Sequence, residues 1–450
     1  MISKTFCILP WIQLSTRPNG HVRLCCTANA SSAGPTNDKI YGGEIGILKE
    51  NNGQPSNFGS HDLTTLWNND FMKYIRLTML KGEIPPSCSK CFTEEASGYR
   101  SKRNWETIYW SKRLDVDQIV KDTKEDGSVP PKIYYLDLRM GTKCNLKCIM
   151  CSPHDSSMWV GDWKKLYPQI ENESLKELCS WKKDSGGGGS YTWHKNNPRF
   201  WNQLYDQLPN LRQLYFAGGE ALVIEEHYTL LEEIIKRGYG DQIELRYNSN
   251  GIDIPDRLFE LWDKFYNVRF HFSIDSIKDM NHYIRYPTKW NKITDSLRIL
   301  DESKDNIEVT IACAVQALNV YYIPDIIKWK IEQNFKKINL FPLGAGLINF
   351  HFVYHPALLN VKVLPNWFKI EVKDKFEKFY DWLINNYRND DEFIESGHGI
   401  KKLKGIVKFM FSQSWARRLP EFQEYINLLD NIRNTNFRET FPEMERILDE

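Results

Sequence analysis

The sequence lacks a long apolar run, an excess of one charge and an internal repeat. No stretch approaches the roughly 18 apolar residues that a membrane-spanning helix needs. Residues 6–14 are too short, and too interrupted by Pro10 and Gln13, for a secretory signal. The 59 Lys and Arg residues balance 58 Asp and Glu residues, which leaves a formal charge of +1 and no overall attraction to nucleic acid or anionic lipid. These absences predict a cytoplasmic protein that binds neither membrane nor nucleic acid.

The composition is that of a folded chain. Hydrophobic residues make up 41% and charged residues 26% of the 450 positions, which excludes general disorder. At about 100–200 residues per domain, the length allows two or three domains. The 15 Trp, 22 Tyr and 23 Phe residues suit either a packed core or a chamber for a flat or chain-like ligand, and composition leaves both interpretations open.

Cysteine is the most informative residue type. Ten are present, and all except Cys179 and Cys313 fall into two groups along the chain. We expect those two to be packing cysteines, with Cys313 on the helix-facing side of its strand. A disulfide framework is typical of small secreted domains, whereas clustered cysteines in a long cytosolic chain more often hold metal. The two groups are therefore candidate metal sites.

The chain divides into a cysteine-rich domain, a polar linker, an alternating α/β core and a mostly helical extension, predicted at residues 1–105, 106–130, 131–345 and 346–450. Within the first part, the alternation around Pro18 and Gly20 predicts a hairpin over residues 11–25, and residues 61–81 predict an amphipathic helix.

The core has six candidate strands, at residues 133–138, 214–217, 243–247, 268–273, 307–315 and 337–341. Helical stretches such as residues 225–237 and 293–302 lie between them, which predicts a parallel sheet and the α/β fold class. A glycine-rich stretch at residues 186–190 has a flexible composition and carries no functional argument.

The strands alternate polar and apolar side chains with period 2. One face of the sheet is therefore predicted to pack on helices, and the polar face to line an open barrel around a wet ligand chamber. The alternative is that the polar face meets solvent. Arg269, His271 and Glu308 lie on this face and are candidate catalytic or substrate-binding residues; hydrogen-bonded structural roles are the alternative.

Shortly after the first core strand, Cys144, Cys148 and Cys151 follow the spacing C-x3-C-x2-C. Iron–sulfur clusters are usually held by four thiolates, so three would leave one iron open to a further ligand. An open coordination position marks a reactive metal site. The alternative is a zinc site completed by His154.

This triplet resembles the signature of the radical S-adenosylmethionine (SAM) superfamily, and the resemblance covers residues 131–345. It implies a partial (β/α)6 TIM-like barrel with a [4Fe–4S] cluster on Cys144, Cys148 and Cys151. Met150 stands where the family often has an aromatic residue. The resemblance further implies SAM contacts from residues at the strand ends, namely Met150, Gly218, Gly219, Glu220, Asn248, Asn250, Ser273, Asp275, Arg285, Val315 and Gln316. The implied chemistry is reductive cleavage of SAM to a 5′-deoxyadenosyl radical, which abstracts hydrogen from a substrate.

The N-terminal cysteines resemble the SPASM/twitch auxiliary-cluster domains, because Cys7, Gly20 and Cys25 follow the spacing C-x9–15-G-x4-C. Cys88 and Cys91 would complete four ligands for a second [4Fe–4S] cluster, with Cys26 either spare or exchanging with Cys25. The alternative is a structural zinc site on the same four thiolates. The domain normally follows the barrel, whereas here it precedes it.

The two resemblances together imply an oxidoreductase that acts on a peptide or protein side chain, by oxidation or crosslinking, with an electron donor such as flavodoxin or ferredoxin. A dehydrogenase or epimerase of a sugar or other small molecule is the alternative enzyme. A redox or metal-binding module without catalysis is the non-enzymatic alternative.

Overall fold

The structure is a computed structural model that describes residues 3–28, 46–96, 98, 100–179, 191–338, 348–387 and 398–450. Residues 29–45, the glycine-rich stretch at residues 186–190 and all but the first two residues of the strand predicted at residues 337–341 lie outside the described residues.

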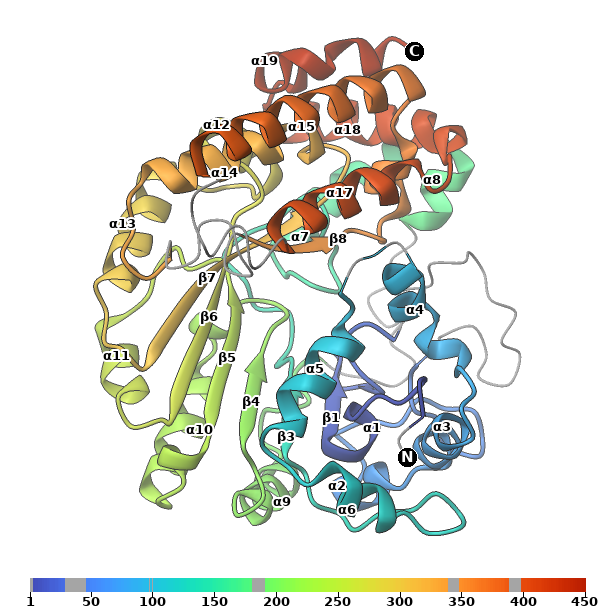
Figure 1. The fold of residues 1–450 in the computed structure, drawn as a ribbon, viewed down its shortest axis with the longest axis vertical. Coiled ribbons are helices and arrows are strands. Elements are labelled where there is room, and N and C mark those ends of the chain that lie inside the picture. Colours follow the sequence, from blue (N-terminus) through green and yellow to red (C-terminus); the bar gives the residue numbers. More distant parts are fainter. Residues whose placement is uncertain are drawn as a thin grey trace. The chain divides into compact units, whose positions relative to one another are not determined.

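The strands form one sheet of eight, in the order β2-β1-β3-β4-β5-β6-β7-β8 (Figure 1). They are β1 Gln13–Thr16, β2 Val22–Arg23, β3 Tyr135–Leu138, β4 Gln213–Phe216, β5 Glu244–Ser249, β6 Asn267–Ser273, β7 Ile307–Val315 and β8 Asn349–Phe352. β1 and β2 pair antiparallel, whereas β1 with β3, β3 with β4, β4 with β5 and β7 with β8 pair parallel. The α/β class predicted from the sequence is thus confirmed.

Helices separate most of the parallel strands, as crossovers require. They are α1 Leu9–Ile12, α2 Leu63–Trp67, α3 Asp70–Leu80, α4 Ser89–Ala96, α5 Lys102–Ser111, α6 Val116–Lys121, α7 Trp159–Leu166, α8 Glu173–Leu178, α9 Pro198–Gln207, α10 Glu225–Lys236, α11 Asp256–Trp262, α12 Lys278–Ile284, α13 Trp290–Asp301, α14 Ile323–Glu332, α15 Asn366–Tyr387, α17 His398–Phe411, α18 Leu419–Arg433 and α19 Phe437–Thr440. None of the helices in the described ranges is both long and apolar enough to cross a membrane.

The chain separates into two compact units whose boundaries differ from the four predicted parts. The first unit comprises residues 1–142, 183–247 and 257–268, and the second comprises residues 143–182, 248–256 and 269–450. The N-terminal residues therefore share a unit with β3 and β4, because β1 pairs with β3.

The predicted hairpin is present, since Ser15 pairs with Arg23 and Thr16 with Val22. Gly20 adopts a φ of +84° in its turn, a left-handed conformation that favours glycine. The helix predicted at residues 61–81 is divided into α2 and α3. The division occurs at Asn69, whose side chain accepts a hydrogen bond from Phe71 N and so begins a new helix.

In the first unit, the polar face of β3–β5 is covered by helix α5, which begins before the predicted linker and runs into it. Glu106 of α5 pairs with Arg246 of β5 at 2.9 Å, and the Tyr109 hydroxyl donates to Glu244 at 2.7 Å. The opposite face meets α10, where His227 hydrogen-bonds the Tyr247 hydroxyl at 2.8 Å. In this unit the polar face is thus buried against α5 and does not line the wet chamber that the sequence predicts.

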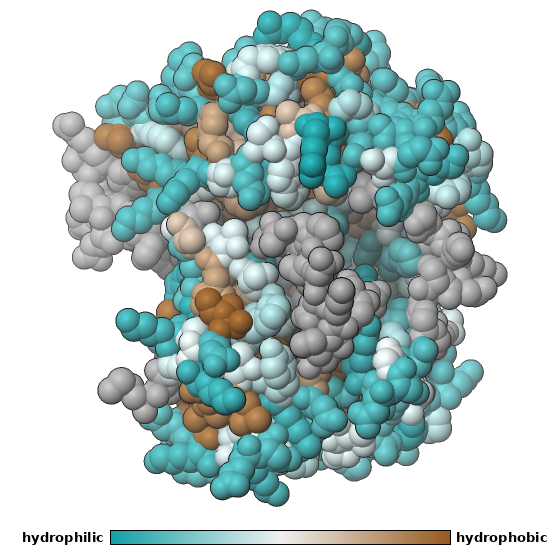
Figure 2. Space-filling view, turned by 90° about the vertical axis from the view of Figure 1, so that its right-hand side faces the viewer, coloured by the Kyte–Doolittle hydropathy of each residue, from teal (hydrophilic) through white to brown (hydrophobic). Residues whose placement is uncertain are grey.

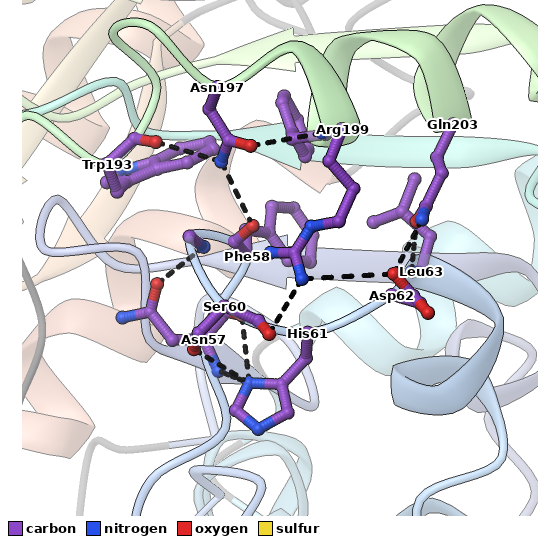
Figure 3. Close-up of polar contacts among 12 residues, drawn as sticks. Asn57, Phe58, Ser60, His61, Asp62, Leu63, Trp193, Asn197, Arg199 and Gln203 are labelled. Atoms are coloured by element: carbon purple, nitrogen blue, oxygen red, sulfur yellow. Dashed lines mark hydrogen bonds and ion pairs between the residues drawn. The ribbon is translucent and has the colours of Figure 1, made fainter.

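Residues 60–63, which lead into α2, are fastened to α9 (Figure 3). Arg199 donates to Ser60 O at 2.8 Å. The Gln203 amide donates to Asp62 at 2.7 Å and accepts from Leu63 N at 2.7 Å. These hydrogen bonds pair polar groups of the segment before α2 and a backbone N–H at the N-terminus of α2. They therefore attach this part of the chain to α9.

The C-terminal part of the second unit is helical, as predicted, and contains α15, α17, α18 and α19.

On the face drawn in Figure 2, hydrophilic side chains dominate the described surface and hydrophobic ones gather in small separate groups.

Arg76 of α3 holds the N-terminal residues together. It is fully buried, and its guanidinium donates to the backbone carbonyls of Pro10, Trp67 and Gly127 and to the Asn68 side chain, at 2.8–3.2 Å. Three carbonyls and one amide oxygen from three separate segments thus converge on one side chain.

Replacing Arg76 with Met should lower the free energy of unfolding by about 3 kcal/mol or more, because it leaves several buried acceptors unpaired. Urea unfolding followed by circular dichroism measures this. Lys81→Met, an exposed change at the end of the same helix, should stay close to the parent. Equal stability of the two variants would contradict the role assigned to Arg76.

Candidate functional site

The loop after β3 carries the cysteine triplet. Cys148 is buried, and Cys144 and Cys151 are half-buried. The loop folds on itself, because Leu146 N donates to the Cys144 sulfur at 3.5 Å and Cys151 N donates to Cys148 O at 2.9 Å. Neither helix nor strand forms here, so the three cysteines lie on a short turn.

Two backbone hydrogen bonds fix this loop to the last residue of α12 and to the segment after it. Lys147 N donates to Tyr286 O at 2.7 Å, and Ile149 N donates to Ile284 O at 2.8 Å. The Asn250 side chain, at the end of β5, donates to the Asn145 side chain at 2.7 Å. The structure therefore brings Asn250, predicted from the sequence as a SAM contact, against the cysteine loop.

Arg285 lies between the triplet and the end of β6. Its Nε is 2.8 Å from the Asp275 carboxylate, and its Nη1 donates to the Cys148 sulfur at 3.9 Å. A hydrogen bond from Cys151 lowers the pKa of Cys148, burial opposes this, and Arg285 lowers it further. The site therefore favours the thiolate form of Cys148, which is the form that binds metal.

Asp275 is fully buried and organises the strand ends around it. Its carboxylate accepts from Ala314 N of β7 at 2.6 Å, and its own N–H donates to the Asn281 side chain at 3.0 Å. Burial raises the pKa of Asp275, and the adjacent Arg285 opposes this. Sequence reasoning assigned Asp275 and Arg285 separately to SAM, whereas the structure pairs them with each other.

Gln316 follows β7 and is fully buried, yet neither its amide nitrogen nor its amide oxygen has a hydrogen-bond partner in the part of the chain that the structure describes. A buried amide without partners is costly. A ligand with one donor and one acceptor on the same edge, such as a purine base, would satisfy both atoms. The residue thus fits the SAM adenine predicted beside Val315 and Gln316.

The turn after β4 lies in the first unit. Gly218 and Gly219 have φ values of +78° and +58°, and an added Cβ on Gly218 would meet the Arg139 side chain at 3.1 Å. The Glu220 side chain accepts from Leu222 N at 3.2 Å. Only glycine suits this tight turn, which exposes backbone groups of the kind that bind an amino group.

For the other predicted SAM contacts, the structure gives only their burial or their position in a strand. Met150 and Ser273 are half-buried, Asn248 lies in β5, and Val315 pairs in register with Phe352 of β8.

Of the packing cysteines, Cys313 is fully buried in β7 and Cys179 is buried after α8, where burial raises its pKa to about 12.

The three candidate catalytic residues form cross-strand pairs. Arg269 of β6 lies 3.1 Å from Glu308 of β7, and the His271 ring is 2.6 Å from the Thr310 hydroxyl. The Glu308 side chain is 55% exposed. At about 3.3 Å per residue, Glu308 lies roughly 23 Å before the end of β7, and His271 roughly 7 Å before the end of β6. Of these residues, His271 is thus the nearest to its strand's carboxyl end.

Four of the five N-terminal cysteines line one cavity in the first unit. Cys7, Cys25, Cys88 and Cys91 come from the start of the chain, the end of the hairpin and the turn into α4, and the cavity is also lined by Thr27 and the cations Lys90, Lys102 and Arg103. Two of these thiols contact the Thr27 hydroxyl, at 3.2 Å for Cys25 and 4.0 Å for Cys91. The structure therefore gathers the four residues that the SPASM/twitch resemblance grouped.

The thiols repel one another as thiolates. Burial raises the pKa of Cys7, and so do Cys88 and Cys25; for Cys91 the pKa rises to about 11 through burial and Cys25. Across the described ranges, no three His, Cys, Asp or Glu side chains are grouped to hold a single metal ion. Four thiols around a cavity with three cations nevertheless fit a larger group that carries negative charge.

Residues 138–328 match the sequence model of the Radical SAM superfamily. This stretch of the chain is therefore similar to a radical SAM domain. The match includes the cysteine triplet and the strand ends after β4 to β7, and the superfamily implies an enzyme that uses a [4Fe–4S] cluster and SAM.

Solved structures similar to this chain include "Crystal structure of Streptococcus suis SuiB", with 12% identity, a TM-score of 0.32 and coverage of 70% of this chain and 62% of that one. SuiB bound to S-adenosylmethionine has 12% identity, a TM-score of 0.34 and coverage of 70% and 63%. TYW1 with a lysine-pyruvate adduct has 14% identity, a TM-score of 0.25 and coverage of 55% and 71%. The chain thus covers less than two thirds of the SuiB chains, and no function is transferred at these scores. A search of curated proteins found no match.

Sequence reasoning missed the charged network behind the N-terminal cavity. Lys102 lines the cavity and donates to Glu106 at 2.8 Å, and Glu106 in turn pairs with Arg246. Burial alone would raise the pKa of Glu106, but Lys102 and Arg246 lower it to about 2. The alternating charges of β5 were visible in the sequence, but their partner helix lay in a stretch predicted to be a linker.

Glu106 should make stability depend on pH. Its folded pKa is below its ordinary value of 4.5, so its contribution is complete above about pH 4.5 and is lost as pH falls toward 2. The contribution is on the order of 3 kcal/mol. Urea unfolding should show Glu106→Gln less stable than the parent at pH 7, with the difference shrinking below pH 4.5. The exposed change Glu125→Gln should show no such convergence; a difference for Glu106→Gln that is independent of pH would contradict the assignment.

Proposed function

We propose that this protein is a radical SAM oxidoreductase with a second iron–sulfur cluster at its N-terminal cysteines. The observation that carries the proposal is the cysteine loop of the radical SAM domain, held against Arg285 and Asp275. When bound, the triplet's cluster and SAM supply a 5′-deoxyadenosyl radical that removes hydrogen from a substrate. The strands are proposed to curve into a partial (β/α)6 barrel.

The chain's own residues position the reactants. Cys144, Cys148 and Cys151 would hold the cluster of the triplet, and Arg285 places a positive charge beside the Cys148 sulfur. The Gln316 amide supports a hydrogen-bonded adenine, and the glycine turn after β4 supports an amino group close to the backbone. Burial of these groups limits access of water to a reactive centre.

A second cluster is supported by the four thiols that line one cavity with three cations. Cys7, Cys25, Cys88 and Cys91 would hold it, and the cations would offset the negative charge of a cluster with four thiolates. Zinc on the same cysteines is the competing assignment.

The proposed substrate is a peptide or protein side chain, as the SPASM/twitch resemblance implies, and the electron donor is a flavodoxin or ferredoxin. We propose His271, nearest to its strand end, as the substrate-contacting residue among the three candidates. A sugar or other small molecule is the alternative substrate. Deuterium transfer into 5′-deoxyadenosine from labelled peptides or labelled sugars distinguishes these classes.

With dithionite and SAM, the reconstituted protein should release 5′-deoxyadenosine even without substrate. Cys148→Ala should abolish the release, because it removes a ligand of the open cluster. Cys179→Ala, which changes a buried cysteine outside both groups, should retain the parent rate. Liquid chromatography with mass spectrometry measures the product, and a fully iron-loaded parent that never cleaves SAM would favour the non-enzymatic redox module.

Anaerobically reconstituted protein should contain about eight irons per chain, from two [4Fe–4S] clusters. Replacing Cys144, Cys148 and Cys151 together with Ala should remove about half of this iron, and replacing Cys88 and Cys91 should remove the other half. Iron, sulfide and zinc analyses measure the content. Zinc on the N-terminal cysteines, with iron lost only through the triplet, would overturn the second cluster.

A further inference from the structure

Side chains satisfy several backbone carbonyls of the cysteine loop. Four successive carbonyls each accept from a side chain. They are Leu146 O from the Ser156 hydroxyl at 2.5 Å, Lys147 O from Arg433 at 2.8 Å, Cys148 O from the Trp159 indole at 2.8 Å and Ile149 O from the Tyr425 hydroxyl at 3.1 Å. A loop without helix or strand must satisfy buried carbonyls in this way.

Two of these four donors come from α18, about 280 residues further along the chain. Tyr425 and Arg433 are eight positions apart, a little over two helical turns, so both lie toward the same side of the helix. α18 also contacts α7 and α8, and the Glu424 carboxylate accepts from Glu171 N at 2.6 Å before α8. The helix therefore runs from the start of α8 to the cysteine loop.

Arg433 is held rigidly in this position. Its side chain is 2% exposed, its Nε is 3.0 Å from the Asp162 carboxylate, and its guanidinium lies 4.4 Å from the Trp159 ring centroid. Asp162 also pairs with Lys147 at 2.6 Å. One arginine thus connects α18, α7 and the residue immediately before Cys148.

We propose that α18 is a clamp that sets the geometry of the cysteine triplet, with Arg433 and Tyr425 as its positioning residues. The inference rests on the proposed cluster at the triplet, and it assigns a role to the C-terminal helical residues that family membership does not supply. Because the two donors fix the carbonyls on either side of Cys148, loss of either lets that thiol leave the position a cluster requires.

Arg433→Met and Tyr425→Phe test the clamp. The first removes the donor and its charge with little change in volume, and the second removes only a hydroxyl. To isolate the triplet's cluster, both are made in a chain in which Cys88 and Cys91 are Ala. Partners that orient metal ligands typically change metal affinity at least tenfold, so iron should leave Arg433→Met about tenfold faster under a chelator, and Tyr425→Phe should show a smaller effect.

A readout independent of activity is the electron paramagnetic resonance spectrum of the reduced cluster. Its g values should change in both variants, and the shift that SAM induces should be reduced, because the thiolate geometry is altered. Arg438→Met is the matched control, since Arg438 of α19 makes an exposed ion pair with Asp449 and does not contact the loop; it should match the parent in spectrum and iron loss.

The outcomes separate the clamp from the proposed function. A parent that binds no iron at the triplet overturns the proposed cluster itself. A parent that binds iron, with Arg433→Met and Tyr425→Phe unchanged in iron loss and in spectrum, overturns the clamp alone. If Arg433→Met fails to fold, Tyr425→Phe and Arg433→Lys test the clamp in its place. Lysine keeps the positive charge but cannot bond both Lys147 O and Asp162 with one planar group.

Discussion

The buried backbone of the cysteine loop is the constraint on which the second unit depends. The loop forms neither helix nor strand, so its buried carbonyls lack the partners that a regular element would supply, and four of them accept from side-chain donors. Ser156, Trp159, Tyr425 and Arg433 are those donors. The C-terminal helices thereby become part of the site, although their residues lie far from it in sequence.

Electrostatics around the triplet follow from the same arrangement. Arg285 neutralises Asp275 and also reaches the Cys148 sulfur, so one guanidinium serves a buried carboxylate and a thiolate. Buried charges persist only when they are paired. Asp275 in turn joins the ends of β6 and β7 through Ala314 N, so the site is built into the sheet and does not depend on loops alone.

In the first unit, too, buried polar groups on the sheet require hydrogen-bond or charge partners from elsewhere in the chain. Glu244 and Arg246 would be costly on a buried face without partners, and α5 supplies them, while the Gln213 amide donates to Glu244. Lys102 extends this network to the cavity of the four N-terminal cysteines. The same helix therefore fills the polar face and contributes a cation to the candidate second site.

The sequence by itself determined the α/β class, most strand positions and the spacing of the cysteine triplet, because hydrophobic period and cysteine spacing are local properties. It also indicated the hairpin and the glycine turn after β4, where backbone conformation is dictated by one or two residues. It did not reveal that Asp275 and Arg285 pair, that α5 covers the polar face, or that β1 joins β3. Only tertiary structure decided these, together with the contacts of Tyr425 and Arg433, because each depends on which distant donor reaches a buried acceptor.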